Sequence, residues 1–218
     1  MHVRTSGIVL RETPYRETDK MLTVLARGEG KVSVSAKGAQ RRGSPFTAAT
    51  QLLAYSEMAL FESHGRYQLD EVETIDLFFP LRQDLDAFSL AIYLAELTDN
   101  VCGEGDERDG VLQLLLYTLQ VLCRGAVKRG TALVKAAFEL RLMWLEGFVP
   151  EPEGLRELAR LSAGAFEAMK HATTCELNRL FAFGLNENDT AIFADACETL
   201  AKAQIDRSLA SLEEYHKL

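Results

Sequence analysis

The chain has 218 residues, of which 47% are apolar and 26% are charged, and its formal net charge is −8. These values are ordinary for a globular protein with one large or two small domains. No apolar stretch approaches the roughly 20 residues that cross a bilayer, and the first residues lack the apolar run of a signal peptide, so we expect no membrane association and a cytoplasmic location.

Charge is unevenly distributed along the chain. Residues 1–45 carry nine basic and four acidic side chains, a net charge of +5, so residues 46–218 sum to −13. A basic segment on an otherwise acidic protein indicates a binding site for a polyanion. The densest part of this segment, residues 37–42, is predicted to form a basic loop at the end of a strand.

Five strands are predicted in the first 76 residues. Residues 31–37 alternate in polarity, with Val32 and Val34 on one face and Lys31 and Lys37 on the other, which is typical of a half-buried strand. The other predicted strands span residues 6–13, 20–27, 52–62 and 66–74. Five short strands separated by turn signals favour a small closed barrel, of which the five-stranded OB-fold is the commonest.

The apolar period changes from two to between three and four near Pro80, which indicates helices. The predicted helices span residues 81–95, 111–122, 131–146, 155–161, 162–180 and 189–218, with a break expected near residues 173–174. Ser162 and Asn188 are the predicted N-caps of the last two, and Gly147 with Pro150 should end the third. The sequence therefore predicts an α+β protein, with an OB-fold domain of residues 1–79 followed by an all-helical domain of residues 80–218.

The patterns that usually carry catalysis are missing. Gly30 and Lys31 resemble the end of a phosphate-binding loop, but Leu25 stands where that loop needs glycine and Val32 where a hydroxyl must reach magnesium. The four histidines are scattered. The cysteines show no paired spacing and are interpreted as buried free thiols: Cys102, Cys123, Cys175 and Cys197. We therefore predict a protein that is not an enzyme and that holds no metal ion and no cofactor.

The basic half is suited to an extended anionic ligand. Lys31 and Lys37 lie on one face of a strand and are separated by about 20 Å, the length of about three phosphates of an extended strand. Arg41 and Arg42 can extend this track. Aromatic side chains that could stack on bases are Tyr15, Phe46, Tyr55 and Tyr67. Spacing alone leaves DNA and RNA open, and residues 37–42 could also be a solvated loop or contact an acidic protein.

Several short segments, in their order and spacing, carry a family resemblance. They are Thr5–Leu10, Tyr15–Thr23, Gly30–Val32, Ala36–Arg42, Leu69–Glu73, Leu81–Leu85, Tyr93–Leu97, Phe138–Leu142 and Leu145–Pro150. Together they resemble the RecO family of recombination-repair mediators. The resemblance fades after Glu151, although Arg207–Leu212 is similar to the last helix of the family.

The resemblance implies an N-terminal OB-fold, a helical domain and no bond chemistry. Proteins of this family bind single- and double-stranded DNA and anneal complementary strands. They act in DNA repair with RecR and with the acidic C-terminal tail of single-stranded DNA-binding protein (SSB), and they help to load RecA. The resemblance therefore also implies an association with the nucleoid.

The resemblance also suggests site residues. The predicted DNA-contacting residues are Lys31, Lys37, Arg41, Arg42, Arg11 and Arg16. A groove for the SSB tail is suggested around Lys135, Phe138, Arg141 and Leu142. The spacing of Phe138 and Leu142, four residues apart, equally suits the buried face of a core helix.

The chain departs from the family pattern in two places. Many members carry a four-cysteine zinc finger after the Gly-Phe-Val-Pro segment, whereas residues 150–160 here contain no cysteine. Gln40 also stands where many members have a basic residue. These departures leave a second hypothesis open, in which the protein is an adaptor that binds RecR and SSB and has weak affinity for DNA.

Overall fold

The computed structural model of the chain describes residues 2–125, 130–149, 152–158 and 162–218. Packing divides the chain into a barrel unit, Met1–Arg82 with Ala95–Gln113, and a helical unit, Gln83–Leu94 with Leu114–Leu218. The predicted domains of residues 1–79 and 80–218 stay a prediction. Among the described residues, no helix has the length and apolar character to cross a membrane.

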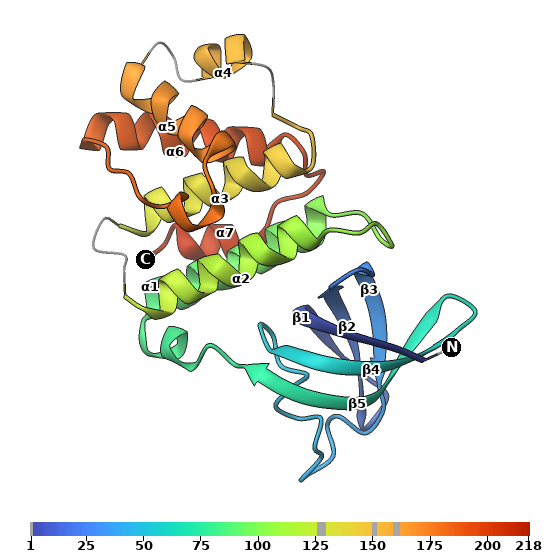
Figure 1. Cartoon of the computed structure of the whole chain (residues 1–218). Coiled ribbons are helices and arrows are strands. Elements are labelled where there is room, and N and C mark those ends of the chain that lie inside the picture. The colour runs from blue at the N-terminus through green and yellow to red at the C-terminus, as the bar shows by residue number, and fades with distance from the viewer. Residues whose placement is uncertain (1, 126–129, 150–151, 159–161) are drawn as a thin grey trace. The chain divides into compact units, whose positions relative to one another are not determined.

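The barrel unit contains five strands (Figure 1). They are β1 (His2–Tyr15), β2 (Asp19–Ala26), β3 (Gly30–Ala36), β4 (Tyr55–Ser63) and β5 (Arg66–Asp76). The strands close in the order β1-β2-β3-β5-β4, with β3 and β5 parallel and the other pairs antiparallel. This confirms the predicted OB-fold barrel followed by helices. β4 begins at Tyr55 rather than at residue 52, because Leu53 adopts a φ of 68° in the preceding turn.

The alternating pattern of β3 explains how the barrel is filled. Val32 and Val34 are buried and Ser33 between them is exposed, as the period of two predicts. They join a core of apolar side chains from all five strands, which includes Val9, Leu22, Val24, Leu60 and Leu69. The polar residues of β3 consequently lie on the outer face of the barrel.

A segment from later in the chain packs on the turn between β2 and β3, within the barrel unit. The Gly105 amide donates to the Lys31 carbonyl oxygen at 3.1 Å, and the Gly28 amide donates to Asp109 Oδ1 at 2.9 Å. Gly30 has a φ of 69°, and a Cβ atom there would overlap the carbonyl oxygen of Asp106. The absence of a side chain at Gly30 therefore allows this close approach.

We expect Gly30→Ala to lower the free energy of unfolding of the barrel unit strongly. The positive φ costs alanine about 1–2 kcal/mol, and the overlap with Asp106 adds about 1–3 kcal/mol. Gly28→Ala is the matched control, because Gly28 has a φ of 72° but no atom within 4 Å of its Cβ position. Urea unfolding should therefore place Gly30→Ala well below Gly28→Ala, and equal losses would contradict the proposed overlap.

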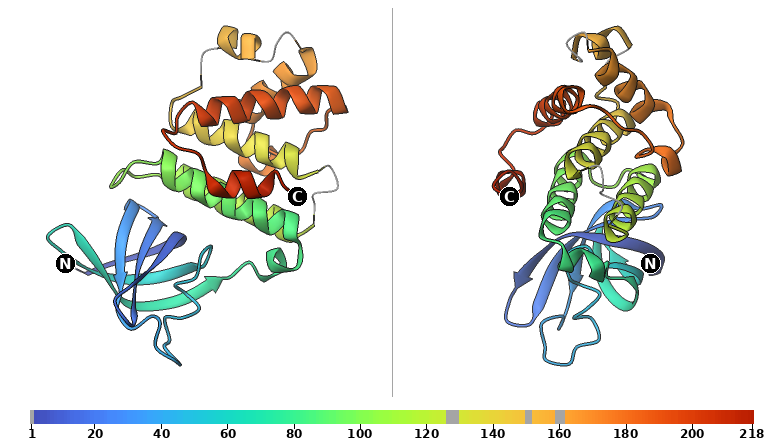
Figure 2. Two further views of the ribbon diagram at one scale, coloured as in Figure 1. Left: turned by 180° about the vertical axis from the view of Figure 1, so that it is seen from behind. Right: turned by 90° about the vertical axis from the view of Figure 1, so that its left-hand side faces the viewer.

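Helices form most of the described residues that follow the strands. They are η1 (Phe79–Gln83), α1 (Leu85–Val101), α2 (Asp109–Cys123), α3 (Thr131–Leu145), α4 (Pro152–Leu158), α5 (Ala163–Thr174), η2 (Leu177–Arg179), α6 (Glu187–Lys202) and α7 (Ala210–Tyr215). α1 and α2 contribute residues to both units. In the helical unit, α3 packs against both α5 and α6 (Figure 2), and every side chain from Leu133 to Met143 is buried.

The predicted helices are confirmed with adjustments. The helix predicted over residues 81–95 divides into η1 and α1, and α1 continues to Val101. The helix predicted over residues 162–180 ends at Thr174, where a break was expected, and Ser162 caps it by accepting from the Ala165 amide. The single helix predicted over residues 189–218 is wrong, because the chain leaves helical geometry between α6 and α7. Asn188 is also not the cap of α6: Asn186 accepts from the Asp189 amide. The predicted helix stop at Pro150 and residues 159–161 lie outside the described residues.

Candidate nucleic-acid interface

Two loops of the barrel unit meet at one end of β2. The Gly38 amide donates to Asp19 Oδ1 at 2.8 Å, and the Gln40 amide donates to the Thr18 carbonyl oxygen at 2.8 Å. The Gln40 side chain donates to the Asp19 carbonyl oxygen at 2.6 Å. These bonds fix the β1–β2 loop against residues 37–43.

Asp19 carries a negative charge within this pair of loops. The hydrogen bond from Gly38 lowers the pKa of Asp19, and smaller contributions come from the Thr18 hydroxyl and from the charges of Arg16 and Arg41. Arg16 and Arg41 thus both act on the same carboxylate, although they come from different loops. The loops therefore collect their cations at one end of the barrel.

The exposed cations of this end are Arg16, Lys37, Arg41 and Arg42, hereafter the basic end. Within the described part of the chain, no hydrogen bond or ion pair engages the charged groups of Lys37, Arg41 or Arg42. Arg16 lies over the ring of Tyr15, with its guanidinium carbon 5.2 Å from the ring centroid. Charges that are exposed and not committed to internal partners are available to an anionic ligand.

Arg11 and Lys31 are placed differently from the basic end. Arg11 Nε donates to Asp99 Oδ2 at 2.9 Å, and Lys31 Nζ lies 3.5 Å from Asp99 Oδ1 and donates to the Asp99 carbonyl oxygen at 2.5 Å. The Lys31 side chain is only 12% exposed. The track from Lys31 to Lys37 expected on β3 is therefore not an open row of cations. Asp99 had no local sequence signal, because it lies 68 residues from Lys31 in the chain.

The four candidate stacking residues also differ in their exposure and contacts. Tyr15 is 45% exposed, whereas Phe46 and Tyr67 pack against the barrel core. Tyr67 donates to Glu29 at 3.0 Å, and burial raises its pKa. Tyr55 is half-buried and donates to Ser6 Oγ. Tyr15 alone of the four thus combines exposure with a place beside the basic end.

The structure corrects the prediction of a groove for the SSB tail. Phe138 and Leu142 have no exposed surface, Lys135 is 3% exposed and Arg141 is 8% exposed, so these residues line no open groove. Arg141 donates to the carbonyl oxygens of Ala172 and Cys175 at 2.5 and 2.6 Å. The alternative reading as a core helix is confirmed, because α3 is covered by its neighbours.

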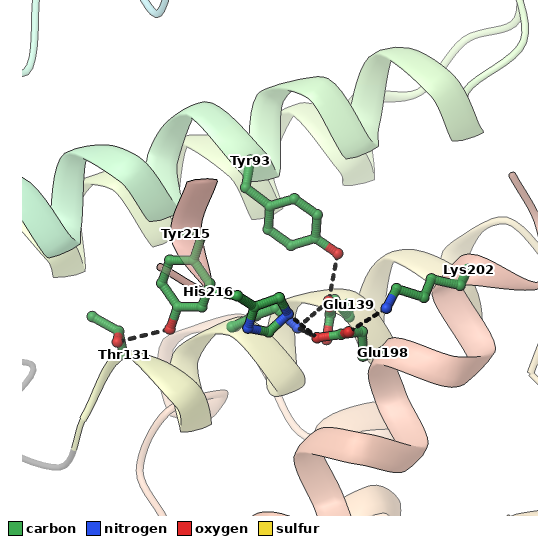
Figure 3. Close-up of polar contacts among 8 residues, drawn as sticks. Tyr93, Thr131, Glu139, Glu198, Lys202, Tyr215 and His216 are labelled. Atoms are coloured by element: carbon green, nitrogen blue, oxygen red, sulfur yellow. Dashed lines mark hydrogen bonds and ion pairs between the residues drawn. The ribbon is translucent and has the colours of Figure 1, made fainter. Parts of the chain in front are cut away.

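Lys135 is buried and belongs to a charge network in the helical unit. Figure 3 labels its other members, Tyr93, Glu139, Glu198, Lys202 and His216. Its Nζ lies 2.8 Å from Glu139 Oε1 and 2.6 Å from Glu198 Oε2. Tyr93 donates to Glu139 at 2.5 Å, and Lys202 and His216 contact Glu198 at 2.6 and 3.0 Å. The network joins side chains of α1, α3 and α6 to the residue that follows α7.

The two carboxylates of this network respond oppositely to their surroundings. Burial raises the pKa of Glu139, although Lys135 counteracts it. For Glu198, burial also acts to raise the pKa, but hydrogen bonds from Lys135 and Lys202 outweigh it and lower the value to about 2. Glu198 is therefore the carboxylate whose ionised form the fold stabilises.

We expect this difference to appear as an acid-dependent loss of stability. Unfolded glutamate titrates near a pKa of about 4.3, so the Glu198 contribution is complete above that pH and is lost as the pH falls towards 2. The free energy of unfolding of the wild type should exceed that of Glu198→Gln at pH 6, and the difference should shrink by pH 2.5. A difference that does not change with pH would contradict the assignment, and Glu167→Gln, at an exposed pair, serves as the control.

In the described part of the chain, no three His, Cys, Asp or Glu side chains are placed to hold a metal ion. No disulfide joins the four cysteines, all of which lie in the described ranges; Cys102 and Cys197 are buried and the other two are half-buried. The expectations that the protein has no metal, no cofactor and no enzymatic activity stay predictions.

Two family models match the chain. The description of the first is Recombination protein O N terminal, and it matches residues 1–78, which include the whole barrel of strands. The second, Recombination protein O C terminal, matches residues 82–154. The two matches follow one another along the chain in the order expected for one protein family.

Curated relatives of the chain include several DNA repair proteins RecO. The protein from Acetivibrio thermocellus is 25% identical, with 97% of this chain and 95% of the relative aligned. The proteins from Alkaliphilus metalliredigens and Symbiobacterium thermophilum are 37% and 36% identical over 69% and 66% of this chain, which spans 60% and 56% of their lengths. The first alignment has 241 positions, 23 more than this chain has residues, so the relative contains segments without a counterpart here. The matches to both halves and to these relatives show that the chain belongs to the RecO family of DNA repair and recombination proteins.

Proposed function

We propose that the protein is a DNA-binding recombination mediator that binds single- and double-stranded DNA and anneals complementary strands. The observation that carries this proposal is the basic end, where four exposed cations and Tyr15 gather on two loops of an OB-fold. Phosphates would pair with the cations, and a base could stack on Tyr15. Because Arg11 and Lys31 are engaged by Asp99, the proposed DNA-contacting set is Arg16, Lys37, Arg41 and Arg42.

The proposal extends to protein partners through family membership. We propose that the protein acts with RecR and with the acidic SSB tail, and that it helps to load RecA on SSB-coated DNA near the nucleoid. These roles require binding of surfaces and not bond chemistry. They are consistent with a chain in which no catalytic pattern is evident.

A pocket of the helical unit is a better candidate for the acidic tail than the buried Lys135 region. It has a volume of about 280 Å³ and is lined by Tyr117, Val121, Arg124, Leu133 and Phe181. The rings of Tyr117 and Phe181 stack with an interplanar angle of 5° and a centroid distance of 5.8 Å. An apolar side chain of the tail would occupy the aromatic part, and a carboxylate of the tail would pair with Arg124.

The tail pocket can be tested with a fluorescent peptide of the SSB C-terminus. We expect Arg124→Glu to weaken peptide binding about tenfold, because it replaces attraction by repulsion. Lys170→Glu, a charge reversal at an exposed position of α5, is the matched control and should bind as the wild type does. Equal affinity of Arg124→Glu and the wild type would reject the pocket.

The adaptor hypothesis remains the second candidate because the observed ion pairs favour it. Asp99 engages two of the six cations that were expected to contact DNA, which reduces the charge available to a polyanion. In that case the protein would capture RecR and the SSB tail while showing no measurable affinity for an oligonucleotide. The two functions differ in one measurable quantity, the affinity of the protein for DNA alone.

The deciding experiment is an equilibrium titration of a fluorescent oligonucleotide at several salt concentrations, with and without RecR. If four cations contact phosphates, log K against log salt should fall with a slope of about −2 to −3 on single strands. A flat response, or an absence of binding with RecR still captured, would reject the mediator function and support the adaptor.

A further inference from the structure

The barrel unit contains an acidic segment that balances its basic half. Residues 95–113 carry six acidic side chains and one basic side chain, a net charge of −5, whereas residues 1–45 carry +5. Both segments belong to the barrel unit. The excess charge seen in the N-terminal sequence is therefore partly neutralised within the same unit.

Asp99 of the acidic segment makes direct contacts with two cations of the basic half. Its side chain is 8% exposed, and each carboxylate oxygen faces a different cation: Oδ2 accepts from Arg11, and Oδ1 lies 3.5 Å from Lys31 Nζ. Arg11 also donates to Thr23 Oγ1 on β2 at 3.1 Å. One anion thus spans cations from β1 and β3, in the way that two oxygens of a phosphate would.

The contacts of Asp99 lie near the face on which OB-folds usually bind nucleic acid. OB-folds usually bind oligonucleotides on the face of their second and third strands. Lys31 lies on β3, and Thr23 lies on β2 opposite Ser33. Residues 104–109 additionally pack on the β2–β3 turn through Gly105, Asp106 and Asp109. An acidic segment of the protein itself therefore occupies the surroundings where this fold usually holds nucleic acid.

We propose that Asp99 is a specificity-determining residue that excludes DNA from the β2–β3 face and confines it to the basic end. This inference rests on the proposed DNA binding. Asp99 takes the place of a phosphate between Arg11 and Lys31, and its neighbours Glu104 and Glu107 repel the backbone of an approaching strand. Arg11 and Lys31 stabilise the packing of residues 95–109 on the strands of the barrel unit and do not contact DNA.

The test is the isosteric variant Asp99→Asn, measured by oligonucleotide titration against salt. Because it frees the charge of Arg11 without removing volume, we expect DNA affinity about three- to tenfold higher at low salt and a salt slope steeper by about 0.7 on single strands. Asp106→Asn is the matched control, because it also removes one acidic charge from the segment. In the wild type, Asp106 pairs with Arg108 and not with Arg11 or Lys31. The control should change affinity less than twofold.

A second comparison separates the contact from general charge. Arg11→Ala with Lys31→Ala should leave DNA affinity unchanged in the wild type and abolish the gain in Asp99→Asn, while circular dichroism verifies that each variant is folded. The proposal is overturned if folded Asp99→Asn binds DNA as the wild type does, or if the wild-type double variant loses affinity. If the wild type binds no DNA, the proposed mediator function is rejected. In that case, a gain of DNA binding by Asp99→Asn still shows that Asp99 excludes DNA, and no gain overturns the inference.

Discussion

Replacing Lys37, Arg41 and Arg42 together by alanine is expected to weaken binding of single-stranded DNA about 100-fold at low salt. The three side chains are exposed, and in the described part of the chain no hydrogen bond or ion pair engages their charged groups, so we expect their removal to delete phosphate contacts directly. The slope of log K against log salt should fall from about −2.8 to about −0.7, because only Arg16 would remain. The measurement is the oligonucleotide titration described above.

The controls distinguish lost charge from lost structure. Lys37→Arg with Arg41→Lys and Arg42→Lys conserves every charge and should retain most of the affinity and the slope. Arg4→Ala removes one cation that pairs with Glu71 away from the basic end, and it should leave binding unchanged. If the triple alanine variant is folded and keeps the wild-type slope, the basic end is not the DNA site.

Lys135→Ala is expected to lower the free energy of unfolding of the helical unit by about 3–5 kcal/mol at pH 7. Glu139 has no exposed surface, and its Oε2 has no hydrogen-bond partner among the described residues. Without Lys135, the fold would have to bury this charge uncompensated or protonate it. The only tryptophan, Trp144, lies on α3, so its fluorescence in a urea titration reports on this unit.

The matched comparison removes both members of the pair. Lys135→Met with Glu139→Leu replaces the buried charges by apolar side chains of similar volume, and such replacements are often neutral or stabilising. Glu198 keeps Lys202 and His216 as partners in this variant. Two results would contradict an uncompensated charge as the cause of the instability. One is a double variant as unstable as Lys135→Ala, and the other is a loss of less than about 1 kcal/mol in the free energy of unfolding of Lys135→Ala.

The elements of the fold were largely predictable from periodicity. The alternation around Val32 and Val34 reports burial on one face of a strand, and it identified β3 to within one residue. The helix ends were less predictable. Asn188 was chosen as a cap where Asn186 serves, since both are good capping residues and only the backbone geometry distinguishes them.

The candidate site was predictable only in part. The cations of residues 37–42 follow a strand and have no partners nearby in the sequence, so their exposure could be expected. Lys135 and Arg141 could not be assigned in this way. Glu139 lies only four residues from Lys135, but the partners Glu198 and Ala172 lie 63 and 31 residues away. Charged residues on a helix are usually exposed, and these two are buried because distant groups neutralise or accept from them.

The sequence by itself determined the class of fold, the family and the existence of a basic N-terminal half, because periodicity, motif order and charge are local properties. Only the tertiary structure decided which cations remain available. Asp99, far away in the chain, engages Arg11 and Lys31, whereas the loops joined by Asp19 and Gly38 expose Arg16, Lys37, Arg41 and Arg42. The physical reason is that a charge binds DNA only if no internal partner already neutralises it, and folding brings such partners together from distant positions.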